Sequence, residues 1–195
     1  SVERGYRRFY NVLRVAESKA HSTPIFHGEL AAFKRELLER IGGFPTDIGA
    51  DDSHTATRIA LEGYRAVIPG EIVCRESVPM RGYWRWRVRR AQHLVQHFAR
   101  ILRLKPATPS AFRAILRVEA FLHLANPWIL ALAAALLAAS AARGSWLSLA
   151  FLAAGAVLLA YPPYRTWVAT QACLMIAAVR NLFTRELVWE KEKKD

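Results

Sequence analysis

The spacing of apolar residues predicts four helices in the first half of the chain. Apolar positions recur every three or four residues in segments 3–19, 35–41, 52–63 and 80–104. Gly42-Gly43 follows the second helix and Gly63 the third, and glycine commonly ends a helix because it adopts left-handed backbone angles without strain. Short strands are expected at 30–33, 64–68 and 71–75, with Pro69-Gly70 as the turn between the last two.

Two nearly continuous apolar segments dominate the second half. Segments 124–142 and 146–164 are each close to the roughly 20 residues that a helix needs to cross a bilayer. Arg143-Gly144-Ser145 forms a tight turn between them, so we expect a transmembrane hairpin. Segment 166–183 has a mildly polar and an apolar face, which fits either an amphipathic interfacial helix or a third span. A buried helical hairpin of a soluble protein is the alternative.

Positive charge is concentrated beside these apolar segments. The chain has 28 Lys and Arg against 16 Asp and Glu, which gives a net charge of +12. Basic residues cluster in 4–19 and in 81–105, whereas the turn between the two predicted spans holds only Arg143. Basic loops favour the cytoplasmic side of a membrane. We therefore expect a multi-pass protein of the cell (cytoplasmic) membrane, with its catalytic part and C-terminus in the cytoplasm.

A nucleic-acid-binding module is an alternative explanation for the charge. Aromatic and arginine residues alternate between Tyr83 and Arg90, and such segments stack on and neutralise single-stranded nucleic acid. This alternative leaves the apolar hairpin unexplained, so no nucleic-acid partner is predicted. Cys74 and Cys173 lie far apart and outside any C-x-x-C pair, which argues against a disulfide framework or a zinc ribbon.

The organisation of the chain suggests the C-terminal part of a larger enzyme. It begins at Ser1 without a Met or a signal peptide, and its first half is short for a complete enzyme domain. Composition divides it into a mixed region (1–78), an arginine-rich amphipathic helix with a linker (79–110) and an apolar region (111–195).

A series of short motifs in the first half resembles family 2 glycosyltransferases in order and spacing. The motifs are Phe26-His27-Gly28, residues 33–37, residues 41–44, Asp51-Asp52 and residues 62–64. The likeness covers roughly residues 20–104 and is greatest to membrane-integrated members such as the cellulose, chitin and hyaluronan synthases. It implies an α+β fold class: the acceptor-side remnant of a GT-A-type domain, then an interfacial helix and transmembrane helices. It also implies transfer of a sugar from a nucleotide-sugar donor to a hydroxyl, with inversion at the anomeric carbon.

The resemblance implies a catalytic role for the acidic pair. In the family such a pair begins a helix that ends near Gly-Tyr, and the second acid is the catalytic base. Asp52 matches the base, and Asp51 matches the supporting carboxylate. At a helix N-terminus the helix dipole favours the ionised form, which is ready to accept a proton. The alternative is that the two aspartates only cap the helix.

The resemblance also assigns roles on the arginine-rich helix. The family has an Arg-x-Arg-Trp segment there, and Arg87 and Arg89 match its two basic positions, which implies binding of the donor phosphates and stabilisation of the leaving group. Trp86 replaces the usual Gln and Arg90 the usual Trp, a departure that argues against processive polymer synthesis. An arginine-rich helix resting on anionic lipid headgroups is the alternative, and different arginines can serve either role.

Acceptor binding is expected at a loop that matches the family's acceptor pocket. Phe26, His27 and Gly28 form that loop, and with Trp86 they are the predicted acceptor-binding residues. A structural role is the alternative for His27. His54 lies one turn past Asp52 but does not converge with the aspartates on a metal site, so no metal ligand is predicted in this chain.

The donor-binding motifs of the family are missing from this sequence. No Asp-x-Asp pattern precedes Phe26, and no glycine-rich phosphate loop occurs. We therefore expect a divalent metal, Mg or Mn, whose ligands lie outside this chain, and we expect the chain alone to be inactive. The predicted partners are a nucleotide-sugar donor, a lipid-linked or glycan acceptor and a membrane. A non-catalytic membrane anchor or interaction subunit is the alternative function.

Overall fold

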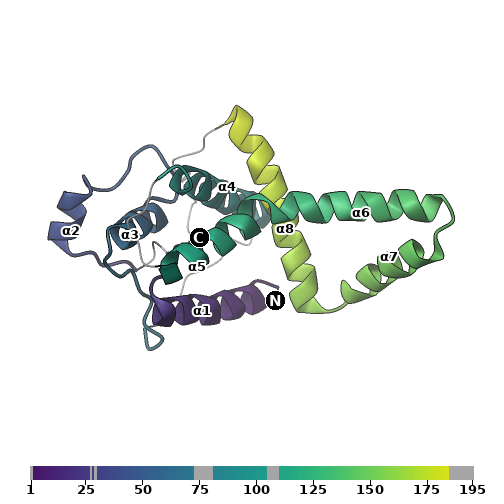
Figure 1. The fold of residues 1–195 in the computed structure, drawn as a ribbon, viewed down its shortest axis with the longest axis horizontal. Coiled ribbons are helices and arrows are strands. Elements are labelled where there is room, and N and C mark those ends of the chain that lie inside the picture. Colours follow the sequence, from purple (N-terminus) through teal and green to yellow (C-terminus); the bar gives the residue numbers. More distant parts are fainter. Residues whose placement is uncertain (1, 27, 29, 73–80, 105–109, 185–195) are drawn as a thin grey trace.

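The structure, a computed structural model of the 195-residue chain, describes residues 2–26, 28, 30–72, 81–104 and 110–184. In these ranges all regular secondary structure is helical. The helices are α1 (Val2–Ala20), α2 (Arg35–Arg40), α3 (Asp51–Leu61), α4 (Tyr83–Ile101), α5 (Ser110–Leu124), α6 (Asn126–Ala142), α7 (Trp146–Leu158) and α8 (Pro162–Phe183). Figure 1 shows α1, α4, α5 and α8 gathered in the middle, α2 and α3 at one end, and the α6–α7 hairpin extending at the other.

The four helices predicted in the first half are confirmed within a few residues, as α1 to α4. The helix that carries the acidic pair begins at Asp51 and ends at Leu61. Gly63 follows with a φ angle of 93°, the left-handed conformation expected of a glycine at this position.

The predicted strands are wrong for the described residues, and with them the α+β fold class. Segments 30–33 and 64–68 are irregular, and segment 71–75 lies partly outside the described residues. The predicted remnant of a GT-A-type domain, with its strands, is therefore wrong for these ranges, because every regular element there is a helix.

Segment 64–68 lacks a strand partner because it follows the end of α1 instead. The Ala66 N–H donates to Ser22 Oγ (3.0 Å), and the Thr23 N–H donates to the Ala66 carbonyl (3.1 Å). The Ile68 N–H also bonds to a serine hydroxyl, that of Ser18 (2.9 Å). Two of these backbone groups are thus satisfied by serine side chains near the end of α1 and one by the Thr23 N–H, rather than by a neighbouring strand.

Helix α4 is the centre of the fold, packed against α3, α5 and α8. One core cluster joins Phe98 and Ile101 of α4 to Phe112 of α5 and to α3. A second cluster joins Val88 of α4 to Leu174 of α8. Apolar side chains on two faces of α4 therefore fix the positions of the surrounding helices.

The prediction that α4 is an interfacial helix is wrong, because neighbouring helices cover it. Arg87 and Arg89 are only 7% and 8% exposed. Arg87 donates a hydrogen bond to Thr170 Oγ1 of α8 (2.8 Å), so its charge is held by protein groups. The predicted domain boundaries at 78 and 110 stay a prediction, although α4 packs directly on helices from beyond residue 110.

The predicted helical hairpin is present as α6 and α7, but its helices are short. α6 has 17 residues and α7 has 13. A 13-residue helix is about 20 Å long, against the roughly 30 Å of a bilayer's hydrocarbon core. Helix α7 ends before Pro162-Pro163, which begin α8 because proline fits the first turn of a helix but interrupts its interior.

The predicted multi-pass membrane localisation, with its transmembrane helices, is therefore wrong. Among the described residues, no single helix is long and apolar enough to cross a bilayer. Only two bent pairs reach the necessary length and composition: α5 with α6, bent by 47°, and α7 with α8, bent by 105°.

Candidate functional site

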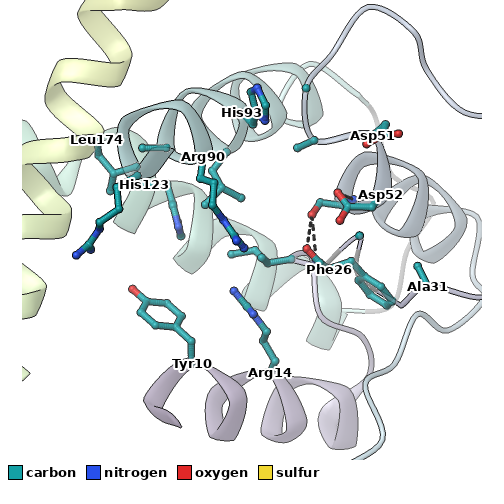
Figure 2. Close-up of a pocket in the computed structure, with 18 of the residues that line it drawn as sticks. Tyr10, Arg14, Phe26, Ala31, Asp51, Asp52, Arg90, His93, His123 and Leu174 are labelled. Atoms are coloured by element: carbon teal, nitrogen blue, oxygen red, sulfur yellow. Dashed lines mark hydrogen bonds between the residues drawn. The ribbon is translucent and has the colours of Figure 1, made fainter. Parts of the chain in front are cut away.

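A cavity of about 660 Å³ lies where α1, α3, α4, α5 and α8 meet the segment before α2. Figure 2 shows side chains from these elements pointing into it. The residues that line the cavity include Tyr10 and Arg14 of α1, Phe26 and Gly28, Asp51 and Asp52 of α3, Trp86, Arg87, Arg90 and His93 of α4, and His123 of α5.

The first turns of α3 hold the segment before α2 in place. The Phe26 N–H donates to Ser53 Oγ (3.0 Å), and the Ser53 hydroxyl donates to the Phe26 carbonyl (3.2 Å). One turn later, the Thr57 hydroxyl donates to the Pro24 carbonyl (3.2 Å). Ser53 and Thr57 share one face of α3 because they are four residues apart. This face therefore fixes residues 24–26 beside the acidic pair.

The two oxygens of Asp52 have different surroundings. Oδ1 accepts a hydrogen bond from the Ser53 N–H (2.6 Å), one of the N–H groups left free at a helix start. Oδ2 faces Gly28, where an added Cβ atom would lie 3.4 Å away. The N-cap residue itself is Ala50, which has no capping side chain. Oδ1 of Asp52 therefore does part of the work of a helix cap. Oδ2 lies beside Gly28, which has no side chain.

The protonation equilibrium of Asp52 is shifted by its position. Burial raises the pKa of Asp52 above its ordinary value, and the charge of Asp51 acts in the same direction. The hydrogen bonds from Ser53 and the charge of Arg90 lower it. Because burial is the largest of these effects, the carboxylate is a stronger base than an exposed aspartate.

The loop before α3 is docked on α4 by a close approach at Gly49. A Cβ atom at Gly49 would overlap the ring of His93. The Gly49 N–H donates to Gln96 Oε1 (3.4 Å), and Asp47 pairs with Arg100 (2.6 Å) at the surface. These contacts with α4 position the start of α3, and with it the acidic pair, relative to the arginines.

The α4 wall of the cavity combines one indole and two guanidinium groups. The Arg90 guanidinium lies 4.8 Å from the centroid of the Trp86 ring, in cation–π geometry. Arg87 donates to Tyr83 Oη (3.2 Å) as well as to Thr170. The aromatic and polar partners hold both guanidinium groups in defined positions.

Most of the predicted site residues meet at this cavity. Phe26, Gly28, Asp51, Asp52, Trp86 and Arg87 all line it. Arg89 is buried but does not line it, so the predicted pair of phosphate-binding arginines is divided. His27 lies outside the described residues. The functional roles of all these residues stay predictions.

The opposite wall of the cavity was missed by sequence reasoning. Tyr10 and Arg14 of α1 and His123 of α5 line it. Tyr10, Arg14 and Glu17 are spaced by four and three residues, so they share a helix face with apolar positions of α1. Charged residues on such a buried face were the available signal. Burial lowers the pKa of His123 to about 4, so its imidazole is neutral at pH 7.

The described residues do not fit a metal site. They contain no group of three or more His, Cys, Asp or Glu side chains that could hold a metal ion. Asp51 and Asp52 are therefore not treated as ligands, and the predicted position of the ligands outside this chain stays a prediction.

Comparison with known proteins gives the family. Residues 3–181 match the family described as Glycosyl transferase family group 2. Among solved structures, the chain is similar to the mannosyltransferase PcManGT from Pyrobaculum calidifontis in complex with GDP-Man and Mn²⁺, with 67% sequence identity and a TM-score of 0.86. That match covers 92% of this chain and 52% of the other, so the chain spans about half the length of that structure. None of the curated proteins matches. Because the family match extends over most of its residues, the chain belongs to glycosyl transferase family group 2.

Proposed function

We propose that this chain carries the catalytic base and the acceptor side of an inverting glycosyltransferase that uses a nucleotide-sugar donor. The observation that carries the proposal is the position of Asp52. Motif residues from three separate parts of the sequence, Phe26, Gly28 and Trp86, meet with Asp52 around one cavity. Family membership supports the reaction class.

In the proposed reaction, Asp52 Oδ2 accepts the proton of the acceptor hydroxyl. The hydroxyl oxygen attacks the anomeric carbon from the side opposite the phosphate, and the bond from that carbon to the phosphate oxygen breaks. Its electron pair leaves with the nucleoside diphosphate. The hydrogen bond from Ser53 orients the carboxylate through Oδ1 (2.6 Å), while Gly28 leaves room for the acceptor beside Oδ2.

Arg87 supports the leaving group in this proposal. Its guanidinium borders the cavity and is oriented by Tyr83 and Thr170, so little reorganisation is needed when charge develops on the phosphate. Arg89 was predicted to share this role. Since it does not line the cavity, no contact with phosphate is assigned to it.

We propose GDP-mannose as the donor, with a divalent metal. The similar mannosyltransferase is in complex with GDP-Man and Mn²⁺, and its identity to this chain supports the same donor and metal here. Because the described residues offer no metal cluster, no step is assigned to the metal through them. The predicted inactivity of the chain by itself is part of the proposal and is tested by adding GDP-mannose to the isolated chain.

The acceptor is proposed to enter beside Asp52, against Phe26, Gly28 and Trp86, with His27 as the predicted fourth contact. A lipid-linked or glycan acceptor was predicted, and the aromatic Trp86 supports contact with a sugar ring. The likeness to polymer synthases and the membrane as a partner stay predictions from the sequence.

The test is transfer from GDP-mannose to an acceptor hydroxyl by the full-length protein that contains this chain, with Mn²⁺. GDP release and the configuration of the product are measured. An α-linked donor should give a β-mannoside, seen by NMR of the anomeric carbon and proton. Asp52→Asn should abolish most of the release, while Asp51→Asn should retain more. An α-linked product would contradict inversion, and full activity of Asp52→Asn would contradict the assigned base.

A further inference from the structure

We propose that Arg14 and Arg90 select an acceptor that carries an anionic group, a carboxylate or a phosphate, near the hydroxyl that receives the sugar. The two side chains enter the cavity from opposite walls, Arg14 from α1 and Arg90 from α4 (Figure 2). The inference rests on the proposed function and names the substrate class of the same site.

Arg90 lines the same cavity as Asp52, where the acceptor is proposed to bind (Figure 2). Its charge lowers the pKa of Asp52, so the guanidinium is within electrostatic reach of the proposed base. It also lies 4.8 Å from the centroid of the Trp86 ring. The acceptor hydroxyl has to come within hydrogen-bond distance of Asp52. A substituent on the neighbouring carbon of the same sugar would therefore approach Arg90.

Arg14 is buried near two acids, Glu17 and Glu119. Arg14 is 5% exposed, and its charge lowers the pKa of both Glu17 and Glu119. Glu17 is itself fixed by the Thr23 hydroxyl, which donates to its Oε2 (2.7 Å). Because the Arg14 side chain is buried, it loses little conformational freedom when it binds an anion.

The charge around the cavity favours an anionic ligand. Among the described residues that line it, three arginines (Arg14, Arg87 and Arg90) are opposed by two aspartates (Asp51 and Asp52). Arg87 is assigned to the leaving group, and the proposal assigns Arg14 and Arg90 to the acceptor. Hydrogen bonds from guanidinium to carboxylate or phosphate are stronger than neutral ones, and a partly buried cavity screens them less than bulk water.

The test compares pairs of acceptors that differ only in charge at one carbon. For the carboxylate, p-nitrophenyl β-D-glucuronide is paired with p-nitrophenyl β-D-glucoside; for the phosphate, glucose 6-phosphate is paired with glucose. The full-length protein that contains this chain, with GDP-mannose and Mn²⁺, should prefer the anionic member of at least one pair by about tenfold or more in kcat/KM. The pair that shows the preference identifies the anion.

Arg90→Gln and Arg14→Gln should each raise KM for the anionic acceptor about tenfold to a hundredfold, the usual range for a lost charge-assisted hydrogen bond. KM for GDP-mannose should change little, and KM for the anionic acceptor should rise more than KM for the neutral one. Arg14→Lys, which keeps the charge, should recover part of the preference. Exposed residues on the same helices give matched controls, Arg85→Gln on α4 and Lys19→Gln on α1.

Three results would overturn the inference. One is equal use of both members of each pair by the wild-type protein. Another is an increase in KM for GDP-mannose rather than for the acceptor, which would place the two arginines on the donor. If no probe is glycosylated, calorimetry with glucose 6-phosphate and with the glucuronide decides: equal binding by wild type and Arg90→Gln contradicts the inference. If the wild-type protein glycosylates neutral acceptors and Asp52→Asn is inactive, the proposed function holds and only the inference about an anionic acceptor fails.

Discussion

Replacing Glu119 by glutamine should make the stability of this protein less sensitive to alkaline pH. Glu119 of α5 is 2% exposed and lies beside Glu17 of α1. Burial, followed by the Glu17 carboxyl, raises the pKa of Glu119 from 4.5 to about 8. The folded chain therefore retains a proton that the unfolded chain loses above pH 4.5. Below that pH both states are protonated, so the unfolding free energy falls as pH rises towards 8.

The size of this effect follows from the two pKa values. Each pH unit between them costs about 1.4 kcal/mol of stability, so the wild-type protein should lose about 2 kcal/mol from this group between pH 6.5 and 8. The Glu119→Gln variant has no titrating group at this position, so it should not lose this part of its stability. Burial lowers the pKa of His54 and His123 to about 4 and that of His97 to about 3, but their contribution is common to both proteins and cancels in the difference.

Urea unfolding followed by tryptophan fluorescence at pH 6.5, 7, 7.5 and 8 measures the difference between the two proteins. Glu36→Gln removes an exposed carboxyl of α2 and is the matched control, with a slope parallel to the wild type. Parallel slopes for wild type and Glu119→Gln would refute the reasoning, because they would show that Glu119 is ionised in the folded protein at pH 6.5.

Further predictions concern the loop before α3, the arginines and the buried histidines. Gly49→Ala places a Cβ atom on the His93 ring, so it should cost about 1–3 kcal/mol in urea unfolding and lower kcat, whereas a silent substitution would mean that the loop is not docked as described. Arg87→Gln should lower kcat about a hundredfold with little change in the KM for acceptor, and Arg89→Gln should mainly lower the melting temperature; the reverse pattern would exchange their assigned roles. His97→Phe should reduce the loss of stability below pH 6.5, by up to about 3 kcal/mol at pH 4. The reason is that wild-type His97 binds a proton at this pH only when the protein is unfolded, and phenylalanine removes that difference. An unchanged dependence of the unfolding free energy on pH between 4 and 6.5 would contradict this.

The helices of the first half were predictable because their signals are local. The apolar spacing of α4 and the glycine after α3 lie within a few residues of the ends that they mark. The role assigned to the acidic pair rests on a resemblance in motif order and stays a prediction. The local turn signal at 69–70 predicted strands around it, but it could not show that the serines at the end of α1 would satisfy segment 64–68.

The errors in the second half arose because apolar or basic composition was taken to show where a segment lies in the protein. The apolar run 146–164 was interpreted as one span, although Pro162-Pro163 within it begin a new helix. Arginines on α4 were expected at a membrane surface, whereas Arg87 is buried against α8 at Thr170. Arg14 of α1 and Glu119 of α5 come together from distant parts of the sequence. No periodicity or spacing within a short window predicts such a contact.

The central claim is that Asp52 accepts the proton of the acceptor hydroxyl, and single-turnover kinetics of Asp52→Asn test it most directly. Asparagine is nearly isosteric and keeps an oxygen for the Ser53 N–H, so folding and the loop of Phe26 should be preserved. The rate of sugar transfer from GDP-mannose should fall on the order of 10²-fold or more, the range for loss of a positioned base, while the Kd for GDP-mannose stays within about twofold. A transfer rate close to that of the wild-type protein, with the donor still bound, would contradict the account.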